Sequence, residues 1–164
     1  MENLFMFLAT SLILRISTPK FRRYLIGHSG CTSLLLSGNN QLHIEHTTER
    51  DVIYFNESTV DGIMYGLICI QMKQLYTMSQ AENILVQYIN RVRKPLQIAY
   101  NSMMEVENLN GQITITDYWQ DNDGVDWKIK GYTNGKTVAV LYVKNITDVP
   151  VKEHDTFLNG LKFR

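Results

Sequence analysis

The sequence contains one short segment, His43-Ile-Glu45-His46, in which side chains that bind metals or transfer protons stand together. Such side chains make a zinc site or an acid–base pair only when they converge on one point. On a β-strand His43 and Glu45 share a face, while His46 points to the other face. The zinc-deaminase signature that begins His-x-Glu also requires a Pro-Cys-x-x-Cys, which is absent. We therefore interpret the segment as the polar face of an outer strand.

A second candidate, Asp121-Asn-Asp123-Gly-Val-Asp126, is similar to a calcium-binding loop. An EF-hand loop would need an acid where Trp119 stands and a bidentate Glu where Lys130 stands, so we interpret the segment as a hairpin turn. The glycine patterns of phosphate loops, dinucleotide-binding turns and nucleophile elbows are also missing. The sequence therefore predicts no metal, no cofactor and no enzymatic activity.

The two cysteines, Cys31 and Cys69, allow at most one disulfide. Both stand beside apolar segments, where a cysteine usually behaves as a small buried hydrophobic residue. We expect two inert thiols in the core.

The charges sum to zero, with 16 Lys and Arg against 16 Asp and Glu. A neutral chain lacks the positive field that nonspecific binding of nucleic acid or anionic membranes requires. The charges are nevertheless segregated, since residues 15–23 contain only basic charges and residues 105–126 only acidic ones. Solvated loops explain this pattern, and so does docking of a protein partner through complementary patches. The candidate partner-binding residues are Asp117, Asp121, Asp123, Asp126, Arg22 and Arg23.

The segment from Leu4 to Leu14 is almost entirely apolar. It is too short to span a bilayer, no Lys or Arg precedes it and no small-x-small cleavage site follows. These features favour a segment that packs on the core of a cytoplasmic protein. The alternative is a signal segment, which would make the protein secreted, periplasmic or membrane-tethered.

Short apolar runs before residue 61 indicate strands at Tyr24–Ile26, Leu34–Leu36, Leu42–His46 and Val52–Phe55. Residues 63–72 are apolar at consecutive positions, as in a strand that is covered on both faces. Ser79-Gln-Ala-Glu82 has the pattern of a capping box, and apolar residues at helical spacing predict a helix from Ser79 to Lys94. A second helix is predicted from Leu96 to about Glu107, with a strand from Leu96 to Tyr100 as the alternative.

The last third predicts a three-stranded meander over Gln112–Trp119, Val125–Tyr132 and Thr137–Lys144. Turn signals at residues 122–124 and 134–135 join these strands, because Asn, Asp and Gly accept the left-handed conformations of tight hairpins. A short helix at Lys152–Asn159 and a strand at residues 161–163 close the chain. The sequence thus predicts an α+β fold with a mostly antiparallel sheet flanked by helices.

Four segments carry a resemblance to a known fold: Gly62–Met72, the helix that follows, the Tyr132–Tyr142 hairpin and Phe157–Phe163. Their order resembles the PsbP-like fold, an α/β/α sandwich shared by the extrinsic photosystem II subunit, a Ran-binding nucleotide-release protein and small bacterial proteins of unknown role. The resemblance covers residues 20–164 and consists of patterns of apolarity, so it transfers no site residue. It implies a binding or assembly module without enzymatic activity.

We therefore expect residues 1–164 to form a single domain, with an apolar segment over 1–17 and a PsbP-like core over 18–164. The predicted function is that of a non-enzymatic protein-interaction or accessory module with a protein partner, and without nucleic-acid binding or stable membrane insertion. One alternative is a small-ligand carrier or enzyme with a cone-shaped α+β fold. A pocket of roughly 300 Å³ or more with convergent polar groups between the sheet and the helix would favour it, and a filled core would contradict it. The other is a secreted or membrane-tethered accessory protein.

Overall fold

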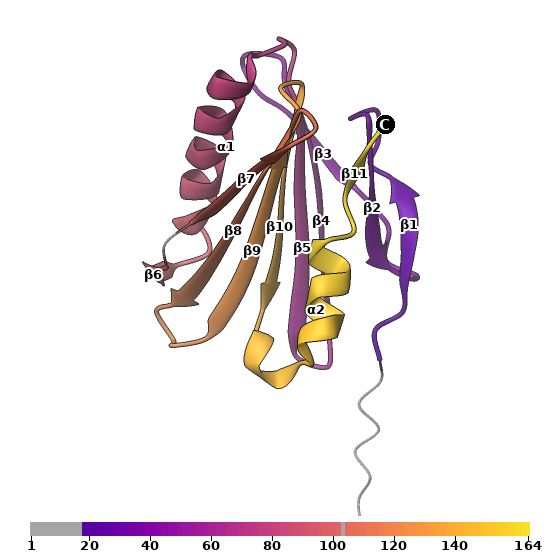
Figure 1. Cartoon of the computed structure of the whole chain (residues 1–164). Helices are drawn as coiled ribbons and strands as arrows, with labels where there is room; N and C mark the ends of the chain where they lie inside the picture. Colours follow the sequence, from indigo (N-terminus) through magenta and orange to yellow (C-terminus); the bar gives the residue numbers. More distant parts are fainter. Residues whose placement is uncertain (1–17, 103) are drawn as a thin grey trace, which may run out of the picture.

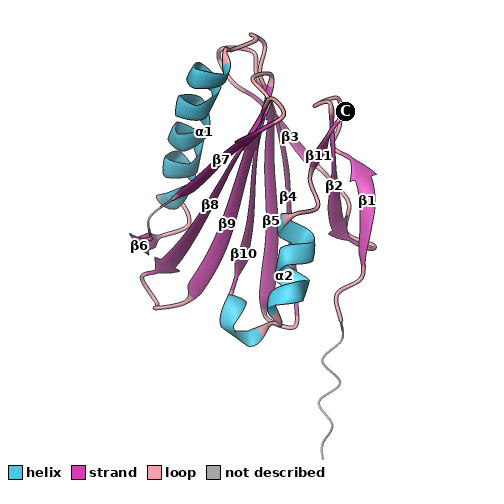
Figure 2. Cartoon of the chain, viewed as in Figure 1, coloured by secondary structure: helices cyan, strands magenta, loops and turns pink. Residues whose placement is uncertain are grey.

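The computed structural model describes residues 18–102 and 104–164. The apolar segment from Leu4 to Leu14, with its two alternative roles, lies outside the described residues. Within them the chain forms two antiparallel sheets and two α-helices (Figures 1 and 2). The expected α+β class with a mostly antiparallel sheet is confirmed.

The small sheet has the order β1-β2-β11, with β1 at Phe21–Leu25, β2 at Cys31–Leu36 and β11 at Lys162–Phe163. The larger sheet has eight strands among the described residues, in the order β3-β4-β5-β10-β9-β8-β6, with β7 also paired to β8. These strands are β3 His43–His46, β4 Val52–Val60, β5 Ile63–Gln71, β6 Ile98–Asn101, β7 Glu105–Leu109, β8 Gln112–Asp121, β9 Asp126–Thr133 and β10 Thr137–Lys144.

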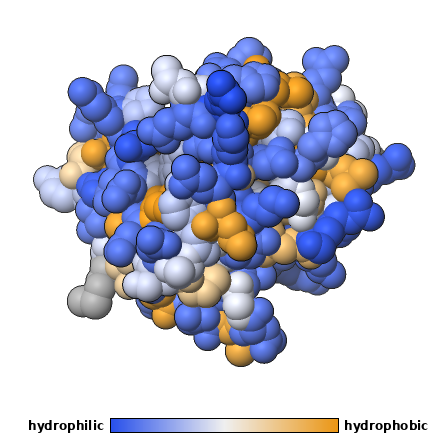
Figure 3. Space-filling model, turned by 90° about the horizontal axis from the view of Figure 1, so that it is seen from above, coloured by the Kyte–Doolittle hydropathy of each residue, from blue (hydrophilic) through white to orange (hydrophobic). Residues whose placement is uncertain are grey.

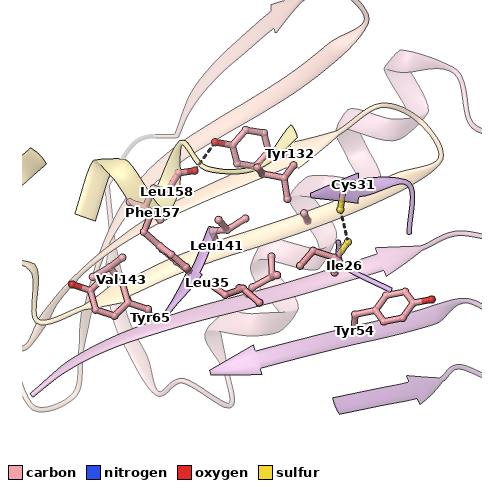
Figure 4. Close-up of a cluster of buried hydrophobic side chains, with 14 of the residues drawn as sticks. Ile26, Cys31, Leu35, Tyr54, Tyr65, Tyr132, Leu141, Val143, Phe157 and Leu158 are labelled. Atoms are coloured by element: carbon pink, nitrogen blue, oxygen red, sulfur yellow. Dashed lines mark hydrogen bonds between the residues drawn. The ribbon is translucent and has the colours of Figure 1, made fainter. Parts of the chain in front are cut away.

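The large sheet is the middle layer of the molecule (Figure 1). Helix α1, Met78–Arg93, packs on one face, and its apolar side chains meet those of β8 to β10. Helix α2, Val151–Leu158, and the small sheet pack on the other face, where Leu35, Tyr65 and Phe157 belong to a second core cluster (Figure 4). A 3₁₀ turn at Ile146–Asp148 precedes α2. Strand β5 lies between the two clusters, which explains its apolar residues at consecutive positions.

Helix α1 begins at Met78, one residue earlier than predicted, and its cap residue lies two residues before the predicted one. Its capping box is formed by Thr77 and Gln80: the Thr77 hydroxyl accepts from the Gln80 amide, and the Gln80 side chain accepts from the Thr77 amide. The predicted box at Ser79 and Glu82 is therefore wrong. The chain before the helix is held extended by a hydrogen bond from Tyr76 N–H to the Gly135 carbonyl, so Thr77 becomes the first residue free to cap.

The predicted second helix after Pro95 is also wrong, because the structure has the strands β6 and β7 there. Gln97 adopts a left-handed conformation with φ of 57°, and its carbonyl accepts from the Asn122 amide. This turn directs the following residues onto β8, where Ile98 pairs with Asp121. The strand proposed as the alternative over Leu96–Tyr100 is nearer to the structure. The spacing of the apolar residues after Pro95 wrongly predicted a helix. The segment forms a strand because it pairs with the edge of β8, and that pairing is not visible in the local sequence pattern.

The meander and the closing elements agree with the predictions within a few residues. Gly124 and Gly135 have φ of 78° and 86°, which are the left-handed turn conformations that their motifs predicted.

Candidate functional site

Two of the predicted docking residues, Asp117 and Asp121, lie inside the molecule. Asp117 is 0% exposed and its Oδ2 accepts from the indole Nε1 of Trp119 at 2.6 Å. Asp121 is 4% exposed and its Oδ2 accepts from the indole Nε1 of Trp127 at 3.0 Å and pairs with Lys144 Nζ at 3.0 Å. These carboxylates accept hydrogen bonds from buried donors, so almost none of their surface is accessible to a partner in this fold.

Asp121 also organises the turn between β8 and β9. Its Oδ1 accepts from the amides of Asp123 and Val125, which confirms the hairpin interpretation of the Asp-rich segment. Burial by itself raises the pKa of Asp121, but the hydrogen bonds from the Val125 amide, Lys144 and the Trp127 indole outweigh it and lower the pKa to about 2.

The other four candidate residues are split between two sides of the molecule. Asp123 is exposed and Asp126 half-buried at the β8–β9 turn, whereas Arg22 and Arg23 lie on β1, across the molecule from that turn (Figure 1). Arg23 Nη1 donates to the Gly160 carbonyl at 2.6 Å and to Thr32 Oγ1 at 3.1 Å. Arg23 therefore ties β1 to neighbouring chain segments, and the structure does not bring the six residues together.

The sheet has a different candidate site on its α1 face. Leu85 and Ile89 of α1 lie directly above Gly131 of β9, where a Cβ would come within 2.9 Å of their methyl groups. Glycine thus permits the helix to approach closely over β8 to β10. The same face continues through β5, β4 and β3 beyond the helix (Figure 1). Half of the face is left without a covering element among the described residues.

The uncovered half forms an open groove of about 410 Å³ between α1 and the strands β3 to β5, which we name the α1 groove. Its floor consists of two cross-strand rows, in which Phe55 lies beside Ile68 and Ile53 beside Ile70. Tyr88, Val92 and Pro95 line the helix side. The groove is apolar along its floor and open to solvent.

Charged side chains stand on both rims of the α1 groove. On the β3 side His43 Nε2 lies 3.1 Å from Glu45 Oε1, with both side chains about two-thirds exposed at 67% and 64%. This contact confirms that the two residues share one face of the strand. On the helix side the Arg91 guanidinium lies over the Tyr88 ring, with Cζ 5.5 Å from the ring centre. Burial raises the pKa of Tyr88, so its phenol is neutral at physiological pH.

Besides the charged side chains on its rims, the groove contains few polar groups. Its one aliphatic hydroxyl, that of Thr47, accepts a hydrogen bond from the Asp51 amide at 3.0 Å. No group of three or more His, Cys, Asp and Glu side chains over residues 18–102 and 104–164 is placed to hold a metal. The arrangement is suited to binding: an apolar floor takes apolar side chains, and the rims hold charges for groups that flank them.

The α1 groove lies between the sheet and the helix, where the small-ligand alternative placed its pocket, but sequence reasoning named none of the lining residues as binding residues. The available signal was the alternation in β4, where half-buried Ile53 and Phe55 alternate with buried Tyr54 and Asn56, so that apolar side chains also occur on the less buried face of the strand. Outside the groove, large exposed apolar side chains are scattered over separate elements, among them Leu75, Tyr100 and Leu109. From above, hydrophobic residues form separate patches among hydrophilic ones (Figure 3).

None of the helices in the described part of the chain has the length and apolarity needed to cross a membrane. Comparison with known proteins found no matching family model and no matching curated protein. Among solved structures, the chain matches cyanobacterial PsbP (CyanoP) from Synechocystis sp. PCC 6803 with a TM-score of 0.55 at 13% sequence identity. The match covers 92% of this chain and 96% of that chain. A likeness at this identity concerns the fold, which is PsbP-like.

Proposed function

From the PsbP-like fold and the α1 groove, we propose that this chain is a non-catalytic binding module that holds an apolar segment of a partner protein in that groove. The observation that carries the proposal is the uncovered half of the α1 face of the sheet, where Ile53, Phe55 and Ile68 are only half-buried. A segment that covered them would remove apolar surface from water, at about 25 cal/mol per Å².

The open shape of the α1 groove favours a protein segment over a small molecule. Pockets for small ligands enclose most of the ligand surface, whereas grooves that take peptides stay open along one side. The charges on the rims also suit a peptide, because an acidic residue of the partner can reach Arg91 and a basic one can reach Glu45.

The acidic docking surface inferred from sequence becomes smaller within this proposal. Asp123 and Asp126 remain available at the β8–β9 turn, while Asp117 and Asp121 serve the core. We assign the turn at most an accessory contact with a basic part of the same partner.

Affinity capture from the native host with matched variants tests the proposal. Ile53→Glu places a charge on the groove floor, and Leu109→Glu places the same charge on exposed β7, where Leu109 is 71% exposed. A thermal unfolding scan first establishes that both variants are folded. We expect the wild type and Leu109→Glu to capture the same protein, and Ile53→Glu to lose it. Equal capture by both variants would contradict the proposal.

A carrier of small amphipathic ligands is the second candidate, because a volume of about 410 Å³ exceeds the roughly 300 Å³ at which ligand pockets begin. Native mass spectrometry of the protein purified from its host distinguishes the two. A small molecule of constant mass that remains bound to Leu109→Glu, but not to Ile53→Glu, would favour the carrier.

A further inference from the structure

The two cysteines of the chain meet between the sheets. Cys31 begins β2 in the small sheet, Cys69 stands near the end of β5 in the large sheet, and both are 0% exposed. Their Sγ atoms are 3.3 Å apart, and the dashed line from Cys31 in Figure 4 marks this contact. A disulfide needs a separation of about 2.05 Å, so the sulfur atoms have little more than 1 Å to close.

The hydrogen bond between the two thiols distinguishes Cys31 from Cys69. The Ser29 hydroxyl lies 3.0 Å from Cys31 Sγ and is fixed by its own 2.6 Å hydrogen bond to the Ile26 carbonyl. The hydrogen bond from the Cys69 thiol lowers the pKa of Cys31 in spite of burial, and the same contact together with burial raises the pKa of Cys69. Cys31 is therefore the first to become a thiolate, which is the nucleophilic form.

We propose that Cys31 and Cys69 form an intramolecular disulfide that links the small sheet to the large sheet when the chain meets a disulfide oxidant. With oxidised glutathione as the oxidant, the Cys31 thiolate attacks one glutathione sulfur and releases one glutathione thiolate. The Cys69 thiolate then attacks the Cys31 sulfur and releases the second glutathione. The two cysteine protons pass to the two leaving thiolates, so two electrons move from the protein to glutathione.

The bond would close a loop of 38 residues, the separation of the two cysteines. A disulfide that closes a loop of that length restricts the unfolded chain, and in a protein of this size it raises the melting temperature by about 10 °C. Such a disulfide persists in oxidising compartments and stays reduced in a reducing cytosol. The two cysteines would then be joined in an oxidising environment, and the disulfide would stabilise the protein there.

Burial of both thiols determines how the test is run. The full chain is unfolded, refolded with either oxidised or reduced glutathione, denatured again and labelled with a maleimide reagent. We expect two labels on the reduced protein and none on the oxidised protein, whose mass falls by the two hydrogens lost. Peptide mapping without reductant should recover the Cys31 and Cys69 peptides joined together.

The single variants Cys31→Ser and Cys69→Ser are the matched controls, and each should carry one label and show no rise in melting temperature on oxidation. Because a serine in the core can unfold the chain, the labelling and mass of the wild type decide the question by themselves. Two labels after refolding in oxidised glutathione, only glutathione adducts, or only intermolecular dimers would each overturn the proposal.

Discussion

The indole Nε1 of Trp127 on β9 donates a 3.0 Å hydrogen bond to the carboxylate of Asp121 at the end of β8. Trp119 on β8 makes the corresponding 2.6 Å contact with Asp117, two residues earlier on the same strand. Both tryptophans are 2% exposed, and an indole buried without an acceptor would cost about 1–3 kcal/mol. Asp117 and Asp121, in the middle of the acidic segment, therefore accept the hydrogen bonds of the two buried indoles.

Replacing Asp121 should lower stability, while its exposed neighbour should tolerate the same change. Asp121→Asn places an amide group where one carboxylate oxygen accepts from Trp127 and pairs with Lys144, and we expect a loss of about 2 kcal/mol. Asp123→Asn, with the same chemistry on an exposed side chain, should stay within about 0.5 kcal/mol of the wild type. Urea unfolding measures both, and equal losses would show that the Asp121 contacts contribute little.

Asp121 should also make the fold sensitive to acid. Its pKa is lowered from 3.8 to about 2, so the unfolded chain takes up the proton first as the pH falls. The stabilisation is fully present above about pH 5 and is lost as the pH falls through 4 toward 2. The free energy of unfolding, measured between pH 5 and 2.5, should therefore fall less steeply for Asp121→Asn than for the wild type. Parallel curves would assign acid sensitivity to other groups.

His154 should produce a second pH dependence, closer to neutrality. The side chain is 4% exposed in α2, and burial lowers its pKa below 6.5, with Lys128 acting in the same direction and Asp155 against it. Protonation thus favours the unfolded chain, and stability should fall as the pH decreases from 7 to 5.

A matched pair of variants tests the role of His154. His154→Gln should flatten the curve of unfolding free energy against pH between 7 and 5, whereas His28→Gln, an exposed substitution, should keep it. A slope that survives in His154→Gln would contradict the assignment.

Gly66 should be the least replaceable residue of β5. The ring of Tyr142 on β10 lies across it, and a Cβ on Gly66 would overlap the ring atoms Cζ and Cε2. Tyr142 is itself held by a 2.7 Å hydrogen bond to Glu57, so the ring cannot simply swing aside. We expect Gly66→Ala to cost about 2–3 kcal/mol.

A double-variant cycle isolates the overlap. In the background of Tyr142→Leu, which removes the ring, the added cost of Gly66→Ala should fall below about 1 kcal/mol. An undiminished cost would locate the strain in the backbone of β5 rather than in the aromatic ring.

Local patterns predicted much of the fold because the responsible interactions lie close together in the chain. The meander from β8 to β10 follows from alternating side chains and from turns at Gly124 and Gly135, all within a few residues of each other. Strand β6 was predicted only as the alternative to a helix, and β7 was not predicted, because the backbone partners of both lie in β8 and a four- or five-residue edge strand carries little pattern of its own.

The sequence by itself determined the α+β class, the long helix, the hairpins and the lack of known catalytic motifs, since periodicity and turn chemistry are local properties. The tertiary structure decided which side chains are accessible, because burial depends on neighbours that are distant in sequence. It enclosed Asp117 and Asp121, separated Arg22 from the acidic turn, and left the α1 groove open by placing α1 over only half of the sheet. It also brought Cys31 within 3.3 Å of Cys69 across 38 residues, because two sheets pack face to face at that point.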